Sequence, residues 1–320
     1  MALSPLNQRR WNNFKANRRA FWSLWIFSIL FGLSLFAEFL AYDKPILVQY
    51  RGSYYTPIWN FYPETEFGGD FQTEAVYRDI EVQCLIISGG VQDCWDDPED
   101  VIDAARDGRL EDTEPEFERG WLIWPPVPYS YNTANDIGGA APSAPDADHW
   151  LGTDDLGRDV LSRLMNGATY TFGLSVVAAL ITTVIGVLLG TFAGINKGIR
   201  SSFLNHLLDV TLSIPSLLLA IIIIAILGPG LMNTVWAIIL ALLPQFIHSI
   251  RNLIVDELGK DYVTAYRLDG ASKWHILSRG IFPNVYEYIV VIFTMALSTA
   301  ILDIAALGFL KLGAQPPTTE

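Results

Sequence analysis

The chain has 320 residues, of which 51% are hydrophobic, and it nevertheless carries a formal net charge of −13. Apolar content and strong acidity rarely coexist in one soluble domain, so the composition excludes a single soluble globule. The two properties are segregated along the chain. This segregation predicts an all-α polytopic membrane protein with a large acidic insertion outside the membrane.

The first apolar run follows a basic segment. Residues 1–20 contain five Arg or Lys side chains and no carboxylate, and residues 21–42 form an apolar stretch. At 1.5 Å per residue this stretch makes a helix of roughly 33 Å, which crosses a bilayer. The basic flank places the N-terminus in the cytoplasm. A signal peptide is the rival interpretation, but the run is long and no small-x-small cleavage site follows, which favours an uncleaved anchor.

Residues 43–150 have a different character, with 22 carboxylates opposed by six basic side chains. Turn residues and short β-like runs predict a small extracytoplasmic domain. An acidic cluster at residues 93–103 lacks the ordered spacing of a calcium loop and predicts a solvated face instead of a metal site. Five aromatic residues could contact a binding protein or a peptide, but more often such residues form a domain core: Tyr54, Tyr55, Trp59, Phe61 and Tyr62.

Both cysteines of the chain, Cys84 and Cys94, lie in this insertion. The Gly89-Gly90 pair between them predicts a turn, and a hairpin there would bring the two thiols within bonding range. A periplasmic compartment permits such a bond. We therefore expect a structural disulfide, with two free thiols as the alternative.

Residues 149–163 read HWLGTDDLGRDVLSR. The two glycines allow tight turns, and an arginine among three aspartates predicts a paired network or an N-cap at the membrane edge. Apolar residues that follow predict a short interfacial helix within residues 151–171. The segment resembles the signature that precedes the transmembrane core of dipeptide, oligopeptide and nickel permeases. By that resemblance the extracytoplasmic signature residues are Gly152, Thr153, Asp154, Gly157, Arg158 and Asp159.

Four apolar runs form the predicted membrane core, residues 172–306: 172–195, 203–227, 233–250 and 285–306. With the first run they make five transmembrane helices, and the loops assigned to the inside hold an excess of Lys and Arg. Glycines at four-residue spacing predict a face on which another helix approaches closely: Gly186, Gly190 and Gly194. Two prolines, Pro215 and Pro244, predict bends in their helices.

Three polar side chains stand out in the core. His206 and Asp209 are three residues apart on one expected helix, near its cytoplasmic end. They predict packing and polar gating contacts between helices in preference to a metal or proton site. Asp303, near the outer end of the last run, is expected at the membrane interface.

A polar cytoplasmic segment, residues 251–284, separates the last two runs. Helix formers at residues 262–268 predict one short helix, and Gly270 supplies a position where the backbone can reverse. Ser272 can cap a second helix that runs to about residue 279. Pro283 then fits the first turn of the next helix, where no amide partner is lost.

This segment resembles the EAA loop of bacterial ABC importer permeases, which in that family enters a cleft on the ATPase subunit. Ala265, Gly270 and the Ile281-Phe282-Pro283 run match its spacing, whereas Thr264 and Tyr266 replace the expected Glu and Ala. By this resemblance the ATPase-coupling residues are Thr264, Ala265, Tyr266, Gly270, Ala271, Ile281, Phe282 and Pro283.

Residues 52–70 and the Trp-Pro-Pro run at 124–126 resemble a branch of this family that includes the second permease of microcin C and longer-peptide importers. The resemblance implies a transport subunit of the bacterial inner membrane. Its partners would be a second permease, ATPase subunits that bind ATP and magnesium, a periplasmic binding protein, a peptide and the lipid bilayer. Residues 307–320 resemble the outer segment before the sixth helix of the family, which the sequence does not reach, so the C-terminus is expected outside.

Other functions remain open. A nickel or dipeptide permease would share the core motifs, and a secondary carrier or a membrane scaffold would need no ATPase. The sequence contains no G-x-x-x-x-G-K-[ST] phosphate loop, which argues against an enzyme with its own ATPase site. It also shows no Cys-His spacing for zinc, and its basic residues lie at helix ends, which argues against a nucleic-acid surface.

Overall fold

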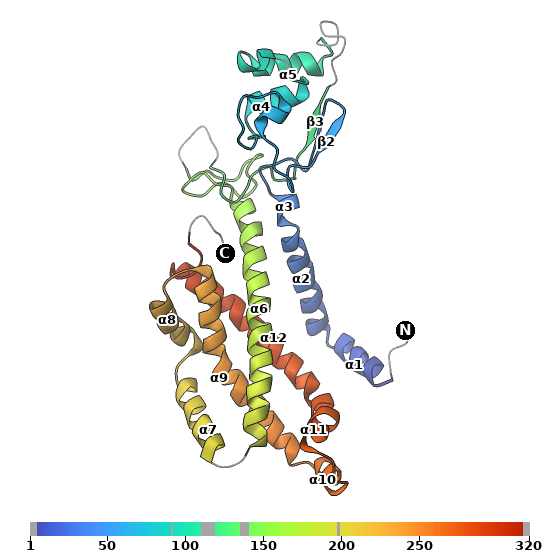
Figure 1. Cartoon of the computed structure of the whole chain (residues 1–320), viewed down its shortest axis with the longest axis vertical. Coiled ribbons are helices and arrows are strands. Elements are labelled where there is room, and N and C mark those ends of the chain that lie inside the picture. Colours follow the sequence, from blue (N-terminus) through green and yellow to red (C-terminus); the bar gives the residue numbers. More distant parts are fainter. Residues whose placement is uncertain (1–4, 91, 110–118, 135–140, 197–198, 316–320) are drawn as a thin grey trace. The chain divides into compact units, whose positions relative to one another are not determined.

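The computed structural model describes residues 5–90, 92–109, 119–134, 141–196 and 199–315. Helices dominate, as predicted for a polytopic membrane protein (Figure 1). The chain divides into two compact units, residues 1–169 and 170–320. Within the described residues, strands are confined to the acidic insertion, residues 43–150, where the sequence predicted short ones.

The first unit begins with three helices: α1 (Pro5–Ala16), α2 (Arg18–Leu35) and α3 (Ala37–Leu40). The helical path is interrupted at Asn17 and again at Phe36, so the expected first span is divided between α2 and the short α3. α2 carries two arginines in its first turn. It is not among the helices that are long and apolar enough to cross a membrane alone, and the first span stays a prediction.

The acidic insertion contains a three-stranded antiparallel sheet in the order β2-β1-β3. Its strands are β1 (Leu47–Tyr50), β2 (Ser53–Tyr55) and β3 (Trp121–Ile123). Positive φ at Arg51 and Gly52 makes the tight turn between β1 and β2. The remaining elements are η1 (Glu64–Phe67), α4 (Ile80–Ile87), η2 (Gln92–Trp95) and α5 (Pro98–Arg106).

Phe67 is the centre of the core of this insertion. It is fully buried, and the rings of Tyr55 and Tyr77 lie 5.2 and 5.8 Å from it, centroid to centroid. Tyr62 packs edge-on against Tyr55 at 5.1 Å. The favoured core interpretation therefore fits two of the five aromatic residues, whereas the other three are exposed: Tyr54, Trp59 and Phe61.

The second unit is built from long helices. α6 (Val160–Ile195) begins in the first unit and continues into the second, where it is followed by α7 (Ile199–Leu212), α8 (Ser216–Leu227) and α9 (Leu231–Leu258). The final elements are α10 (Asp261–Leu268), α11 (Lys273–His275), the π-helix η3 (Ile276–Ile281) and α12 (Phe282–Phe309). The short interfacial helix expected after residue 159 is wrong, because Val160 starts a single helix of 36 residues.

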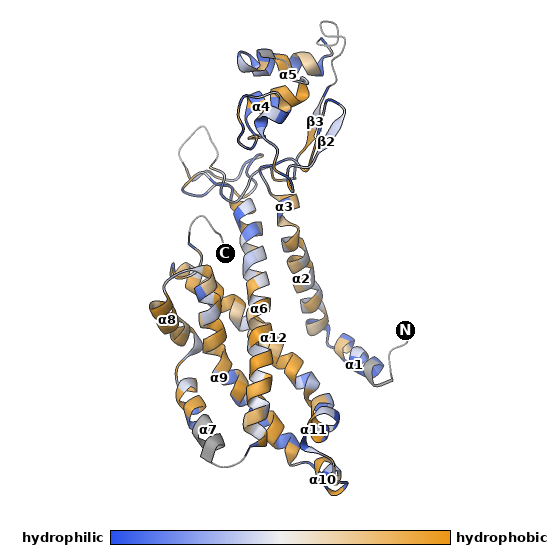
Figure 2. Ribbon diagram, viewed as in Figure 1, coloured by the Kyte–Doolittle hydropathy of each residue, from blue (hydrophilic) through white to orange (hydrophobic). Residues whose placement is uncertain are grey.

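Among the described residues, three helices are long and apolar enough to cross a membrane: Val160–Ile195, Leu231–Leu258 and Lys273–Phe309. A fourth span arises if His206–Leu212 and Ser216–Leu227 are counted together, although they meet at 95°. Pro215 lies at this break, as the sequence predicted, whereas Pro244 lies inside α9 without ending it. Apolar residues dominate these helices, while polar colours prevail in α10 and α11 (Figure 2).

Helices α6 and α9 are in close contact along the glycine face of α6. A Cβ atom at Gly186 would lie 2.9 Å from Phe246 Cβ, and one at Gly190 would lie 2.8 Å from Ile250 Cβ. At Gly194 the nearest atom would be Ile254 Cγ2, at 3.0 Å. These distances leave no room for a side chain, so the predicted glycine face is the surface on which the two helices pack.

Polar side chains in the core differ from expectation. Asp209 of α7 lies 3.9 Å from Nδ1 of His248 on α9, while His206 is exposed. The polar contact between these helices therefore involves His248, which the sequence reasoning did not select, and a gating role stays a prediction. Asp303 is only 7% exposed and lies on the face of α12 that packs inside the unit, while its position at the membrane interface stays a prediction.

Candidate functional site

Residues 251–284, the predicted coupling segment, comprise the end of α9, then α10, α11, η3 and the start of α12. The Glu257 side chain is buried, accepts a hydrogen bond of 2.9 Å from the Tyr262 hydroxyl and forms an ion pair with Lys260. Burial raises the pKa of the Tyr262 hydroxyl, which therefore stays a neutral donor at physiological pH. These contacts fix the angle between the last turn of α9 and the first turn of α10.

A tight reversal follows α10. The Ala271 N–H donates to the Tyr266 carbonyl at 3.0 Å, and Gly270 has φ +77°. A Cβ at Gly270 would meet nothing within 4 Å, so the backbone conformation and not space is what requires glycine there. Ser272 then caps the next helix, because its hydroxyl oxygen accepts the His275 N–H at 3.3 Å.

The second helix of the segment does not end near residue 279. Helix α11, the π-helix η3 and α12 are continuous from Lys273 to Phe309, which corrects the predicted break before Pro283. A π turn rearranges the backbone hydrogen bonds where Pro283 lacks an N–H, and the Asn284 side chain donates to the Gly280 carbonyl at 2.9 Å. The part of the predicted coupling segment after the Gly270 reversal, α11 and η3, therefore forms one rod with α12, whereas α10 lies before the reversal.

Apolar packing holds the segment against the ends of the long helices. Val263 of α10 is fully buried in a cluster that includes Ile254 of α9 and Ile281. Tyr266 turns inward too, since a Cβ at Gly280 would lie 3.3 Å from its ring. The rest of the cluster comprises Ile250, Ile276, Leu277 and Val285. Segment and helix ends thus form one packed body.

The predicted coupling residues fall into two groups. Thr264, Ala265, Gly270 and Pro283 are exposed, whereas Tyr266, Ala271, Ile281 and Phe282 are buried or half-buried. We call the reversal between α10 and α11, residues 268–274, the tip of the segment. Two further side chains project from it: Leu268 is 84% exposed and Trp274 is 73% exposed. The sequence reasoning missed both, although two large apolar residues within a polar segment were a usable signal.

A second candidate site surrounds the start of α6. Gly152 has φ +74°, and a Cβ there would lie 2.4 Å from the Ser143 carbonyl oxygen. The Thr153 hydroxyl accepts the Ser143 N–H at 2.9 Å. Two chain segments are thus tied together immediately before the helix begins.

Asp154 organises the turn that follows. Its carboxylate accepts the N–H groups of Leu156 and Arg158 at 2.9 and 3.0 Å and the Arg158 Nε–H at 2.9 Å. Arg163 Nε lies 3.4 Å from the same carboxylate. Burial by itself would raise the pKa of Asp154, but the hydrogen bonds from Arg158 and Leu156 outweigh burial and lower it. The network predicted around Arg158 therefore forms with Asp154, while Asp155 is exposed.

Asp159 has a different partner from the one expected. It is fully buried, accepts the Ser162 N–H at 2.7 Å as an N-cap of α6, and lies 3.0 Å from His149 Nδ1. The His149 and Tyr129 rings lie 4.4 Å apart, centroid to centroid, and the Arg78 guanidinium lies 4.3 Å from the centroid of the same Tyr129 ring. This series of contacts connects the acidic insertion to the first turn of α6.

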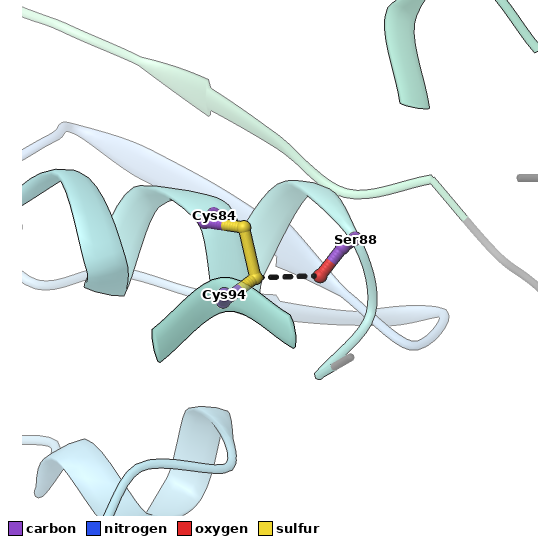
Figure 3. The surroundings of a disulfide bond; sticks show 3 residues. All are labelled: Cys84, Ser88 and Cys94. Carbon is purple, nitrogen blue, oxygen red and sulfur yellow. Dashed lines mark hydrogen bonds between the residues drawn. A yellow bond between two sulfur atoms is a disulfide. The ribbon is translucent and has the colours of Figure 1, made fainter. Parts of the chain in front are cut away.

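The two cysteines are joined in the structure, with Cys84 Sγ and Cys94 Sγ 2.01 Å apart (Figure 3). They lie on α4 and η2, so the predicted β-hairpin is wrong. Positive φ at Gly89 and Gly90 makes the turn, and Ser88 Oγ lies 3.3 Å from Cys94 Sγ. Both cysteines are fully buried beside Leu85.

Comparisons with known proteins identify the family. A family model described as the binding-protein-dependent transport system inner membrane component matches residues 186–320. The YejE inner membrane ABC transporter permease of Escherichia coli is 32% identical, over 97% of this chain and 83% of that protein. The YejE peptidoglycan transport system permease of Agrobacterium fabrum is 34% identical, over 98% and 81%. This chain belongs to the family of ABC transporter inner membrane permeases.

Other matches cover parts of the permease. A model for the N-terminal TM domain of oligopeptide transport permease C matches residues 4–56. The peptide transport system permease SapC of Salmonella typhimurium is 56% identical over 171 residues, which are 53% of this chain and 58% of SapC. The chain thus spans somewhat more than half the length of the SapC relatives that it matches. The coupling segment and the glycine face of α6 lie within the region matched by the inner membrane component model.

Proposed function

We propose that this permease is a membrane subunit of an ATP-driven importer that carries peptides across the bacterial inner membrane. The observation that carries the proposal is similarity to ABC transporter permeases along nearly the whole chain, together with 56% identity to a peptide transport permease over about half of it. Its partners are a second permease, ATPase subunits that bind ATP and magnesium, and a periplasmic binding protein. The N-terminus lies in the cytoplasm and the acidic insertion in the periplasm.

The coupling segment is the contact with the ATPase. Leu268 and Trp274 project from its tip, and their apolar side chains suit a hydrophobic cleft on a partner. Because α11, η3 and α12 form one rod, displacement of the tip moves α12 directly. Glu257 and the buried cluster around Val263 transmit the same displacement to α9. ATP-driven closure of the ATPase pair therefore switches access across the membrane through these two helices.

The test removes the projecting side chains. Leu268→Ala and Trp274→Ala together should reduce co-purification of the ATPase with the permease at least tenfold, because both apolar contacts with the cleft are lost. Phe309→Ala is the matched control, since Phe309 is 88% exposed at the other end of α12. Equal ATPase recovery from the double variant and the control would refute this role for the tip.

For the substrate, we favour microcin C-like or other oligopeptides. Residues 52–70 and 124–126 support this choice through their resemblance to the corresponding branch of peptide permeases. A second candidate is a peptidoglycan fragment, because the Agrobacterium relative is named a peptidoglycan transport permease and is similar over 98% of the chain. Both ligands contain peptide bonds, but an uptake experiment that supplies each of them separately can distinguish them.

Uptake should be measured in cells that lack the permease and in cells that express it. Labelled hexapeptide, labelled muropeptide, dipeptide and nickel are supplied in turn, with and without an ATPase-deficient partner. Hexapeptide uptake that depends on the permease and on ATP hydrolysis supports the proposal. Uptake of nickel or dipeptide alone would refute the proposed oligopeptide substrate and identify the other ligand in its place. Uptake that survives loss of the ATPase would indicate a secondary carrier.

A further inference from the structure

The corner between α1 and α2 is a defined structure. The Asn17 N–H donates to the Phe14 carbonyl at 3.1 Å, and the Phe21 N–H donates to the Asn17 carbonyl at 3.0 Å. The Asn17 side chain also accepts the Ala20 N–H at 3.3 Å, which caps α2. Backbone hydrogen bonds therefore continue on both sides of the break, and α1 turns away from the line of α2 (Figure 1).

Aromatic side chains connect the two helices across this corner. Trp11 stacks on Phe14 at 5.6 Å, Phe14 contacts Phe21 at 6.3 Å, and Phe21 contacts Trp25 at 6.3 Å. Trp11, Trp22 and Trp25 are nevertheless exposed. Exposed tryptophans at the end of an apolar helix are typical of the membrane–water interface, where the ring is apolar and the indole N–H stays hydrated.

The charge at this corner has one sign. Arg9, Lys15, Arg18 and Arg19 are exposed, and the first acidic residue of the chain is Glu38. Lys15 Nζ lies 5.2 Å from the centroid of the Trp11 ring, so cationic and aromatic groups alternate on the same surface. A surface of cations and interfacial aromatics complements a layer of phosphate groups above hydrocarbon.

We propose that the α1–α2 corner is a binding site for anionic phospholipid headgroups, with α1 lying along the membrane surface. Phosphates contact Arg9 and Lys15 on α1 and Arg18 and Arg19 at the start of α2, while the tryptophan rings occupy the headgroup layer. Each cation near such a surface strengthens binding about fivefold. This inference concerns the lipid and does not depend on which substrate the permease carries.

The test uses the full chain, purified in mild detergent from membranes that contain phosphatidylglycerol and phosphatidylethanolamine. Retained lipids are extracted and quantified by mass spectrometry. Arg9→Gln with Lys15→Gln removes two cations from α1. Arg18 and Arg19 stay in place at the start of α2 and keep the orientation of α2 across the membrane. We expect phosphatidylglycerol retention to fall at least fivefold and phosphatidylethanolamine retention to stay unchanged. Arg106→Gln with Arg109→Gln removes the same charge from the exposed end of α5 and the turn that follows it, and should leave both lipids unchanged.

Arg9→Lys is a second control, since it keeps the charge and should keep the lipid. Unchanged phosphatidylglycerol retention in the Arg9 and Lys15 double variant would overturn the proposal, as would an equal loss in the Arg106 and Arg109 control. If the double variant does not purify, the unsubstituted chain is reconstituted with brominated phosphatidylglycerol. Trp11→Phe must then reduce the quenched tryptophan emission; an unchanged quenched fraction would refute the site.

Discussion

The two candidate sites are held together by different forces. At the start of α6, hydrogen bonds and ion pairs of Asp154 and Asp159 fix the turns. In the coupling segment, an apolar cluster around Val263 holds two helices against α9 and α12, while the tip residues remain exposed. Hydrogen-bonded turns resist rearrangement in any direction, whereas a packed body with an exposed tip can move as a unit. The first site is suited to support and the second to transmission.

The largest expected effect comes from the buried polar site. Asp159→Ala removes the N-cap of α6 and leaves His149 buried without its carboxylate partner, which should cost about 3 kcal/mol. The melting temperature of the purified permease reports this loss. Asp155→Ala is the control, because its side chain is exposed and its removal should change stability by no more than about 0.5 kcal/mol. Equal melting temperatures for the two variants would contradict the supporting role.

The next effect concerns the covalent link in the acidic insertion. A disulfide that closes a loop this short stabilises a protein by about 2 to 3 kcal/mol, so Cys84→Ala with Cys94→Ala should lower the melting temperature. A thiol reagent should label the denatured, unsubstituted chain only after reduction. Labelling without reductant would show free thiols and would remove this distinction between the insertion and the coupling segment.

A smaller effect on stability, with a larger one on transport, is expected at Gly270. Valine is strained at φ +77°, so Gly270→Val should cost about 2 kcal/mol locally and disturb the reversal between α10 and α11. ATP hydrolysis by the assembled importer should continue while peptide uptake falls. Gly270→Asn is the matched control, because asparagine tolerates the left-handed region. Unchanged uptake by the valine variant would show that the reversal does not transmit motion.

The smallest effect is a dependence of stability on pH. The pKa of Asp154 is lowered in the folded chain, so its ionised form contributes stability above the unfolded pKa of about 4. That contribution disappears as the pH falls through the lower, folded pKa. At pH 7 the free energy of unfolding of the Asp154→Asn variant should therefore be lower than that of the unsubstituted permease by about 1 kcal/mol or less. This difference should shrink below pH 4. A constant difference would exclude Asp154 as its source.

Local sequence patterns determined much of this molecule. Segregated apolar runs predicted helices, Pro215 predicted the broken span, Gly270 the reversal and Ser272 the cap, because each depends on a residue and its immediate neighbours. Glycine spacing likewise predicted the packing face of α6. These features are properties of short stretches of chain, and one sequence contains the information that they require.

Tertiary structure alone decided which distant groups meet. It paired Asp159 with His149 instead of Arg158, brought Asp209 of α7 to His248 of α9, and buried Asp303. It also joined α11, η3 and α12 into one rod and left Leu268 and Trp274 exposed at the tip. The physical reason is that partner choice and burial depend on how helices pack in space, and periodicity shows that a residue has a face without showing what covers it.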